Sequence, residues 1–377
     1  MTLAGLRIGV IFGSRSPEHE ISVITACQVM PVLTELGAEV VPLYVTKSGR
    51  WRTDPAFAQL ASFRGPLPEE AGAEVAADLG SGRLRLLGGG LLGRSRELPV
   101  DLLFPLVHGS HGEDGTLAGL ADVLRLPQVG SGLLGGALAM DKHRSKLLLG
   151  AAGLPVVGGQ RVASLEEAAA LEVGYPLVVK PNRSGSSIGV TLVPGPGDLN
   201  AALELALRFD REAILEPAVP GAEDLNCAVK RRPERASEVE RPRKEAGFLS
   251  YRDKYAPSGE LLPKGGGKGK GDPRRELPAQ IPPPLRARIQ ELAVRAFDAL
   301  DCGGTARVDF LLSDGGELYV NEVNTVPGSL AFYLWEAGGL GFAELLTDLV
   351  GEALERGVGL DPALPGNLLA GGQLLGK

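Results

Sequence analysis

Residues 305–324 read TARVDFLLSDGGELYVNEVN, and this stretch decides the fold predicted for the end of the chain. Two runs of strand-forming residues flank Asp314-Gly315, a pair typical of a two-residue hairpin turn. This turn places Arg307 opposite Glu322. Because side chains alternate along a strand, one face of the hairpin then carries four polar residues. They are Arg307, Asp309, Glu322 and Asn324. A four-residue loop keeps this shared face, whereas a three-residue loop scatters it.

The oxygen atoms on this face predict a site for a hard divalent cation. Asp309, which the turn places opposite Val320, and Glu322 offer carboxylates, and Asn324 offers an amide oxygen. Mg²⁺ and Mn²⁺ prefer such ligands and complete their shell with phosphates and water. The alternative is a solvated polar face on which Arg307 and Glu322 form an ordinary cross-strand pair.

Length and composition restrict the class of protein. A chain of 377 residues suits two or three domains. The formal net charge of −7 argues against nucleic acid as the main partner, because proteins that follow a phosphate backbone are usually basic. The start lacks the features of a signal peptide, and no apolar run reaches the ~18 residues of a membrane span. We therefore expect a cytoplasmic protein without a membrane partner, whose three cysteines are reduced thiols.

The first part of the chain has the pattern of an open parallel α/β sheet. Polar loops at 13–20 and 108–115 each follow an apolar run, and a helix follows the first loop. Ligands bind beyond the carboxyl ends of parallel strands, so both loops are candidates for a site. The apolar runs that we predict as strands are residues 6–12, 39–45 and 101–107.

Local signals also predict where several helices begin and end. Pro31 is expected to end or kink the first helix. Residues 52–97 have the pattern of loops and short elements, with a turn at Gly88–Gly90. Three residues are predicted N-caps: Asp141, Ser164, which forms a capping box with Glu167, and Asp198.

Lys180 and the residues after it have a composition suited to phosphate. Lys180 ends an apolar strand predicted at 175–181, and a second strand is predicted at 187–193. Between them, Gly185 and Ser186 offer backbone N–H groups and a hydroxyl without bulk. The sequence is not a P-loop, and a plain turn is the alternative. Residues 214–219 form an apolar strand that could present its backbone to a nucleotide base.

The last third of the chain contains a predicted helix and a predicted mobile loop. The helix at 285–300 has Leu285, Ile289, Leu292, Ala296 and Leu300 on one face. The glycine and lysine content of residues 250–272 is typical of a mobile loop.

Several segments together resemble the ATP-grasp superfamily, and within it the D-alanine–D-alanine ligases. The resemblance covers residues 6–345. Several motifs that occur in the same order as in the family are far more specific than any single motif. The segments are GSRSPEHEIS (13–22), HGSHGEDGTLAGL (108–120), MDKHRSK (140–146), VVKPNRSGSSIGV (178–190), SYRDKY (250–255), RVDF (307–310) and NEVNTVPG (321–328).

The resemblance implies an α/β and α+β fold of three domains. The expected domains are an N-terminal open parallel α/β domain at 1–127, a central ATP-grasp subdomain at 128–217 and a C-terminal ATP-grasp subdomain at 218–377. It also implies an activity, which is the joining of two D-alanines through an acyl phosphate to give D-alanyl-D-alanine, ADP and phosphate for peptidoglycan synthesis. Family members often form dimers, so a homodimer is compatible with the resemblance.

The resemblance also implies a role for particular residues. The catalytic residues would be Glu18, Ser186, Tyr255 and Arg307. The amino acid substrates would be bound by Glu18, His108, Arg307 and Gly328. ATP would be bound by Lys142, Lys180, Ser186, Ser187, Glu216, Val219, Glu223 and Lys254. Two Mg²⁺ or Mn²⁺ ions would be bound by Asp309, Glu322 and Asn324.

Alternatives remain for single residues and for the activity. Glu18 could be a helix N-terminal charge, Lys142 a solvated helix residue, His108 a structural histidine and Tyr255 a packing residue. Bulky residues at 332–335 stand where small polar residues are common in the family, so the second substrate could be D-lactate or another amino acid. A non-catalytic nucleotide-binding homologue is the third possibility.

Overall fold

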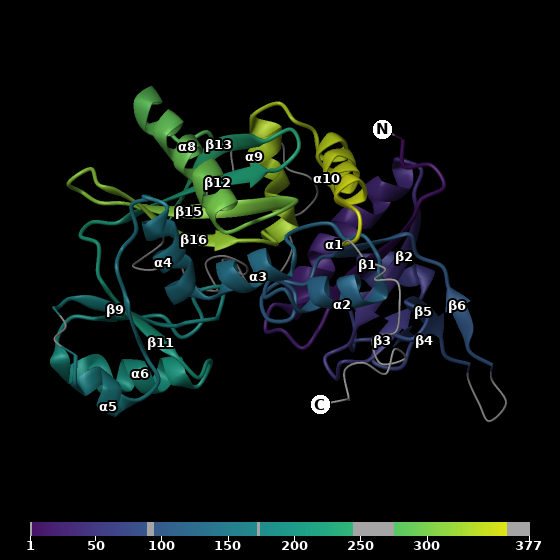
Figure 1. Ribbon diagram of the computed structural model, residues 1–377, viewed down its shortest axis with the longest axis horizontal. Helices are drawn as coiled ribbons and strands as arrows, with labels where there is room; N and C mark the ends of the chain where they lie inside the picture. Colours follow the sequence, from purple (N-terminus) through teal and green to yellow (C-terminus); the bar gives the residue numbers. More distant parts are fainter. Residues whose placement is uncertain (1, 89–93, 172–173, 244–274, 360–377) are drawn as a thin grey trace, which may run out of the picture.

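The computed structural model describes residues 2–88, 94–171, 174–243 and 275–359. The described residues form three sheets, of seven, four and five strands, which follow one another along the chain (Figure 1). The predicted loop at 250–272, with Lys254 and Tyr255, lies outside the described residues, and so do Gly89 and Gly90 of the predicted turn.

The N-terminal sheet is parallel at one side and antiparallel at the other. Its order is β6-β5-β4-β3-β2-β1-β7. The predicted strands are present as β1 (Arg7–Gly13), β2 (Glu39–Val45) and β7 (Leu102–Pro105), and they pair in parallel. The region 52–97 contributes more than loops, because it extends the sheet with antiparallel strands. These are β3 (Trp51–Thr53), β4 (Ala73–Asp78), β5 (Arg83–Leu86) and β6 (Arg96–Leu98), with 3-10 turns at Pro55–Ala58 and Leu60–Phe63.

The first helix, α1 (His19–Glu35), continues through Pro31, so of the two expected outcomes, an end or a kink, the helix end does not occur. A proline inside a helix costs about 3 kcal/mol. Met30 and Leu33 lie on either side of it and are fully buried, and each such burial contributes about 1.5–3 kcal/mol. Packing of this helix face therefore outweighs the lost backbone hydrogen bond.

The C-terminal helix α10 (Phe342–Arg356) packs against α1 (Figure 1). Leu346 and Leu349 of α10 belong to the same buried cluster as Val29 and Leu33 of α1. Trp335, from the short helix α9 (Phe332–Ala337), also belongs to it. Helices α9 and α10 therefore complete the core of the N-terminal unit.

The central unit is a four-stranded sheet of order β10-β9-β11-β8. Before it lie α2 (Thr116–Leu124), α3 (Leu133–Met140) and α4 (Lys142–Ala151). Its strands are β8 (Gln160–Val162), β9 (Leu177–Pro181), β10 (Thr191–Val193) and β11 (Ala213–Pro217), and its helices are α5 (Leu165–Ala169) and α6 (Leu199–Leu207).

Two of the three predicted N-caps are confirmed. Asp141 accepts a hydrogen bond from the N–H of Arg144 at 2.9 Å, and Ser164 accepts one from the N–H of Glu167 at 3.2 Å. Asp198 makes no capping bond, so that prediction is wrong. Asp198 belongs to a 3-10 turn (Pro196–Asp198) and has near-helical dihedrals, whereas a capping residue is extended.

The C-terminal sheet has the order β14-β13-β12-β15-β16. Its strands are β12 (Glu223–Lys230), β13 (Arg235–Pro242), β14 (Arg275–Glu276), β15 (Thr305–Leu312) and β16 (Leu318–Asn324). Helix α8 (Pro283–Ala299) covers one face with Ile289, Leu292 and Ala296, as predicted. A 3-10 turn (Gly328–Ala331) leads from β16 towards α9.

The turn and the register of the β15–β16 hairpin differ from the prediction. Ser313 and Glu317 are joined by a hydrogen bond across three loop residues, of which Gly316 has a φ of +87°. The second glycine favours this longer loop, because its third residue must be left-handed. Arg307 consequently lies opposite Asn324 instead of Glu322, and Asp309 lies opposite Glu322 instead of Val320.

A β-bulge at Asn321 restores the shared polar face. Phe310 pairs with Val320, but Asp309 pairs with Glu322, so Asn321 is the extra residue on β16. The three-residue loop alone would put Asn321 opposite Asp309. The extra residue shifts the pairing by one, so that Arg307, Asp309, Glu322 and Asn324 still lie on one face.

Candidate active site

A row of polar residues crosses the C-terminal sheet on the face opposite α8. The strand registers align Glu240 with Asn226, Asn226 with Asp309, and Asp309 with Glu322. The other face of β12 presents Leu225 and Cys227 to the core under α8. The predicted hairpin face is thus part of a wider polar surface built from four strands.

Asp309 and Arg307 form the most strongly coupled pair on this surface. Arg307 donates to both oxygens of Asp309, at 2.6 and 2.7 Å, and the amide of Asn324 donates to Asp309 at 3.1 Å. Burial alone would lower the pKa of Arg307, but the charge of Asp309 outweighs burial and raises it. Arg307 is therefore a permanent cation beside the predicted metal ligands.

The two predicted phosphate lysines lie beside the hairpin. Nζ of Lys142, the first residue of α4, is 3.4 Å from Glu322 and donates to the carbonyl of Ser184 at 2.7 Å. Nζ of Lys180, on β9, lies 3.3 Å from the amide oxygen of Asn321. The bulge thus aims Asn321 at Lys180. Asn321 was not among the predicted site residues, because only the bulge gives it this position.

Glu216, predicted to bind ATP, lies between two lysines. Lys180 donates to one carboxylate oxygen at 2.7 Å, and Nζ of Lys146 lies 3.1 Å from the other. Lys146 belongs to the MDKHRSK segment but was not among the predicted site residues. Further along the chain, Val219 is half-buried between β11 and β12, and Glu223 is exposed at the start of β12.

Glu18 and Ser186 meet, although 168 residues separate them. The hydroxyl of Ser186 donates to Glu18, which precedes α1 and is 6% exposed. Ser186 and Ser187 have left-handed backbones, with φ of 53° and 57°, a conformation that is unfavourable for residues other than glycine. The glycine-serine loop of the central unit therefore reaches the N-terminal unit in a strained conformation.

His108 connects three segments through both of its ring nitrogens. Nδ1 lies 2.7 Å from the carbonyl of Val326, and Nε2 lies 2.9 Å from the hydroxyl of Thr25. Burial lowers the pKa of His108, and a carbonyl can only accept, so the neutral ring donates from Nδ1 and accepts at Nε2. Thr25 also accepts the N–H of Ser329 at 3.2 Å. His108 thereby holds the segment around Gly328 against α1.

Glu113 makes a second connection between the same parts and was missed by our sequence analysis. Its carboxylate accepts the N–H of Gly109 at 2.9 Å and that of Val326 at 3.0 Å. Burial and the nearby charge of Glu18 raise the pKa of Glu113 to about 8. The sequence feature that could have identified Glu113 as a site residue is its place in the HGSHGEDG loop, five positions after His108.

The bulky residues after Gly328 have different surroundings. Trp335 is 1% exposed in the core, and the ring of Phe332 packs on Phe342 with centroids 4.8 Å apart. The hydroxyl of Tyr333 donates to Glu240 at 2.9 Å. Of these three residues, Tyr333 is thus the one that reaches the polar row.

The predicted cation ligands fit a hard divalent ion by their chemistry. Within the described residues, no group of three or more His, Cys, Asp or Glu side chains could hold a metal ion. The candidate set is instead two carboxylates and an amide, Asp309, Glu322 and Asn324, which share one face. Such a set suits Mg²⁺ or Mn²⁺ when phosphate oxygens complete the shell.

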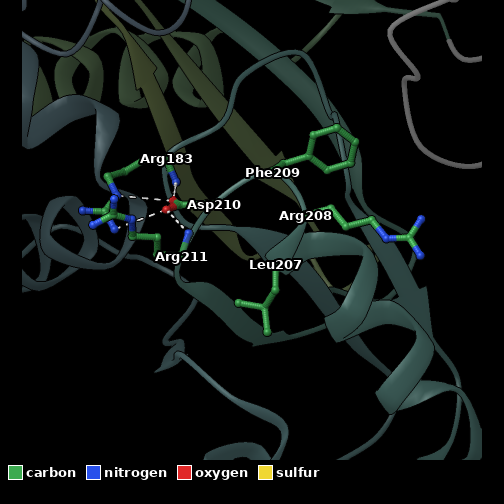
Figure 2. Close-up of a pocket in the computed structure, with 6 residues that line it drawn as sticks. All are labelled: Arg183, Leu207, Arg208, Phe209, Asp210 and Arg211. Atoms are coloured by element: carbon green, nitrogen blue, oxygen red, sulfur yellow. Dashed lines mark hydrogen bonds and ion pairs between the residues drawn. The ribbon is translucent and has the colours of Figure 1, made fainter.

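A separate surface pocket contains none of the predicted site residues (Figure 2). It is lined by Arg183 and by residues 207–211, which begin with the last residue of α6, and Asp210 accepts backbone hydrogen bonds from Arg183 and Arg211. In the part of the chain that the structure describes, no helix has the length and apolar character needed to cross a membrane.

The sheets and the polar site between them define an ATP-grasp enzyme, a class that holds ATP between two such units. Comparisons with known proteins agree. Family models described as "D-ala D-ala ligase N-terminus" and "D-ala D-ala ligase C-terminus" match residues 7–131 and 158–351. The chain belongs to the D-alanine–D-alanine ligase family.

Individual relatives are similar over nearly the whole chain. A D-alanine–D-alanine ligase of Mycolicibacterium vanbaalenii is 39% identical, over 95% of this chain and 99% of the relative. The solved structure of the VanG D-Ala:D-Ser ligase from Enterococcus faecalis has a TM-score of 0.76 and 31% identity, covering 92% of this chain and 99% of that chain. The D-alanine-D-alanine ligase from Coxiella burnetii has a TM-score of 0.76 and 26% identity, covering 93% and 94%.

Proposed function

We propose that this protein is a cytoplasmic ATP-dependent ligase that joins two D-alanines for peptidoglycan synthesis, acting as a homodimer on small molecules alone. One observation carries the proposal. The face with Arg307, Asp309, Glu322 and Asn324 lies beside Lys142, which is 3.4 Å from Glu322, and beside Lys180. Cations and oxygen ligands of this kind are what transfer of a phosphoryl group requires.

The chemistry begins with activation of a poor acyl donor. The γ-phosphoryl group of ATP moves to the carboxylate of the first D-alanine, which gives an acyl phosphate and ADP. The amine of the second D-alanine attacks the carbonyl carbon and loses a proton. Phosphate then leaves with the electron pair of the broken C–O bond. Catalysis consists mainly of positioning and charge neutralisation.

The central and C-terminal units would hold the nucleotide. Lys142 and Lys180 would contact its phosphates, beneath a loop that contains Ser186 and Ser187. The remaining contacts proposed for ATP are Glu216, Val219, Glu223 and Lys254. The support is that the two lysines come from different elements, α4 and β9, and converge on β16.

Asp309, Glu322 and Asn324 would hold two Mg²⁺ or Mn²⁺ ions. When bound, the ions would neutralise charge on the phosphate oxygens. Arg307 and Lys142 balance Asp309 and Glu322 in the structure, so these carboxylates already lie among cations.

The N-terminal unit would hold the amino acids. Glu18 would bind the ammonium group of the first D-alanine, and its contact with Ser186 would join that substrate to the loop over the phosphates. Arg307 and the N–H of Gly328 would stabilise the oxyanion of the tetrahedral intermediate. His108 would act by positioning Gly328 through Val326. Tyr255 would complete the contact between Glu18 and Ser186 when the 250–272 loop closes.

A different second substrate is the alternative, and two observations favour considering it. Tyr333 stands at a position where small polar residues are common in the family, and its hydroxyl contacts Glu240 of the polar row. A relative of 31% identity is named a D-Ala:D-Ser ligase. D-serine, D-lactate and other D-amino acids are therefore the acceptors to compare with D-alanine.

The test is ADP release with single and paired substrates, followed by mass analysis of the product. D-alanine alone should give D-alanyl-D-alanine. A product that forms faster with another acceptor would support the alternative, and ATP binding without turnover would indicate a non-catalytic homologue. Glu322→Ala and Lys180→Ala should each abolish ADP formation, because one removes a proposed metal ligand and the other a phosphate contact. Turnover like that of the wild type in either variant would refute the site.

A further inference from the structure

Lys146 is a buried cation that the proposed reaction does not use. It lies one turn after Lys142 on α4, and its side chain is 5% exposed. Its Nζ lies 3.1 Å from Oε1 of Glu216, whose side chain is 3% exposed. The other oxygen of Glu216 accepts a hydrogen bond from Lys180 at 2.7 Å. One buried carboxylate thus serves two ammonium groups.

This arrangement is costly for stability. Among the described residues, Nζ of Lys146 has no hydrogen-bond partner of good geometry, so its contact with Glu216 is an ion pair without such a bond. Burial lowers the pKa of Lys146, although Glu216 opposes this effect. Replacing a whole buried ion pair by apolar side chains is often neutral for stability, so a buried pair is weak evidence of a role in folding. We therefore ask what Lys146 does for the residues that it contacts.

The charges of these residues suggest a role for Lys146. Lys146, Lys180 and Glu216 together carry one excess positive charge. Without Lys146, Glu216 would have Lys180 as its close cation, and a one-to-one buried ion pair holds its partners strongly. Lys180 would then be less available to a phosphate. Because Lys146 and Lys180 both pair with Glu216, part of the positive charge of Lys180 is left uncompensated.

We propose that Lys146 is a positioning residue for ATP, which holds Glu216 in place so that Lys180 can turn its charge to the phosphates. This inference deepens the proposed function and rests on it, since it concerns the same nucleotide site. Lys146 acts through Glu216 and Lys180 and makes no contact with phosphate itself.

The test is the affinity for ATP and for a non-hydrolysable analogue, AMP-PNP, measured by calorimetry on the full chain. Lys146→Met keeps the length of the side chain and removes its charge. We expect its Kd for AMP-PNP to rise about tenfold, the effect of losing one charge-assisted contact. Lys146→Arg should recover most of the affinity. The KM for D-alanine should stay within about twofold of the wild-type value, because the proposed amino acid contacts Glu18 and Gly328 belong to other segments of the chain than α4, β9 and β11.

A matched control is available in the C-terminal unit. Lys230 is 1% exposed and pairs with Asp348 at 2.7 Å. Lys230→Met removes an equally buried charge from a different place, so it reports the general cost of such a change. Its Kd for AMP-PNP should equal that of the wild type. Equal weakening in Lys146→Met and Lys230→Met would overturn the proposal, because it would indicate a structural effect.

A double-mutant cycle separates action through Glu216 from direct contact with the nucleotide. In a Glu216→Gln background, Lys146→Met should change the Kd by less than about threefold. A full tenfold loss in that background would overturn the proposal, and so would an unchanged Kd in Lys146→Met alone. Failure of the ligase function is distinguishable, because a wild-type protein that binds AMP-PNP but forms no dipeptide still allows this comparison.

Discussion

Thr25 provides the sharpest test of how the N-terminal unit holds the segment around Gly328. Thr25 is fully buried on α1. Its hydroxyl bonds Nε2 of His108 at 2.9 Å and accepts the N–H of Ser329 at 3.2 Å. Thr25→Val keeps the shape of the side chain and removes both bonds. It should therefore loosen the segment without creating a cavity.

The magnitude follows from the two groups that lose a partner. An unpaired buried polar group costs about 1–3 kcal/mol, which applies to Nε2 of His108, whereas the N–H of Ser329 is only half-buried and costs less. The expected loss in the free energy of unfolding is therefore about 1–4 kcal/mol. Thr34→Val is the matched control on the same helix, because the hydroxyl of Thr34 bonds the carbonyl of Met30 one turn earlier and so makes a local bond within α1. That substitution should change the free energy of unfolding by less than about 0.5 kcal/mol.

The assays are urea denaturation and steady-state kinetics. Thr25→Val should lower the urea midpoint and kcat, while the Kd for AMP-PNP should stay near the wild-type value, because the proposed nucleotide contacts belong to the other two units. Thr25→Ser should restore both quantities. If Thr25→Val were as stable and active as Thr34→Val, the inferred connection from His108 to Ser329 would be wrong.

Two further predictions concern Glu113 and Gly316. The pKa of Glu113 in the folded protein, about 8, lies above its ordinary value of 4.5, so its stabilising contribution is complete below pH 4.5 and is lost as pH rises through 8. Glu113→Gln should therefore flatten the decline of the unfolding free energy across this interval in urea titrations, and an unchanged slope would contradict the raised pKa. Gly316→Ala should destabilise the protein by about 1 kcal/mol, because φ is +87° while a new Cβ meets no atom within 4 Å. Differential scanning calorimetry measures the loss of stability as a lower melting temperature. Gly328→Ala is the control, because φ is negative there and a new Cβ also meets open space. Equal melting temperatures of the two variants would exclude the left-handed turn.

The sequence by itself determined the elements that depend on neighbouring residues. Strands such as 39–45, the cap at Asp141 and the apolar face of α8 follow from periodicity and local hydrogen bonding, which act over a few residues. The resemblance assigned catalytic roles to Glu18 and Ser186 and ATP contacts to Lys142 and Lys180. The structure brings the first two into contact and places both lysines beside the hairpin.

Only the tertiary structure decided features that depend on distant contacts. The continuation of α1 through Pro31 needed the buried surroundings of Met30 and Leu33. The shared face of the hairpin needed the bulge at Asn321, because the turn sequence indicated a different loop length. The sequence around Lys146 does not distinguish it from other helix lysines, and only the tertiary structure places Glu216 of β11 beside it. A sequence pattern specifies which side of an element a residue occupies, whereas its partner is decided by packing between elements that lie far apart in the chain.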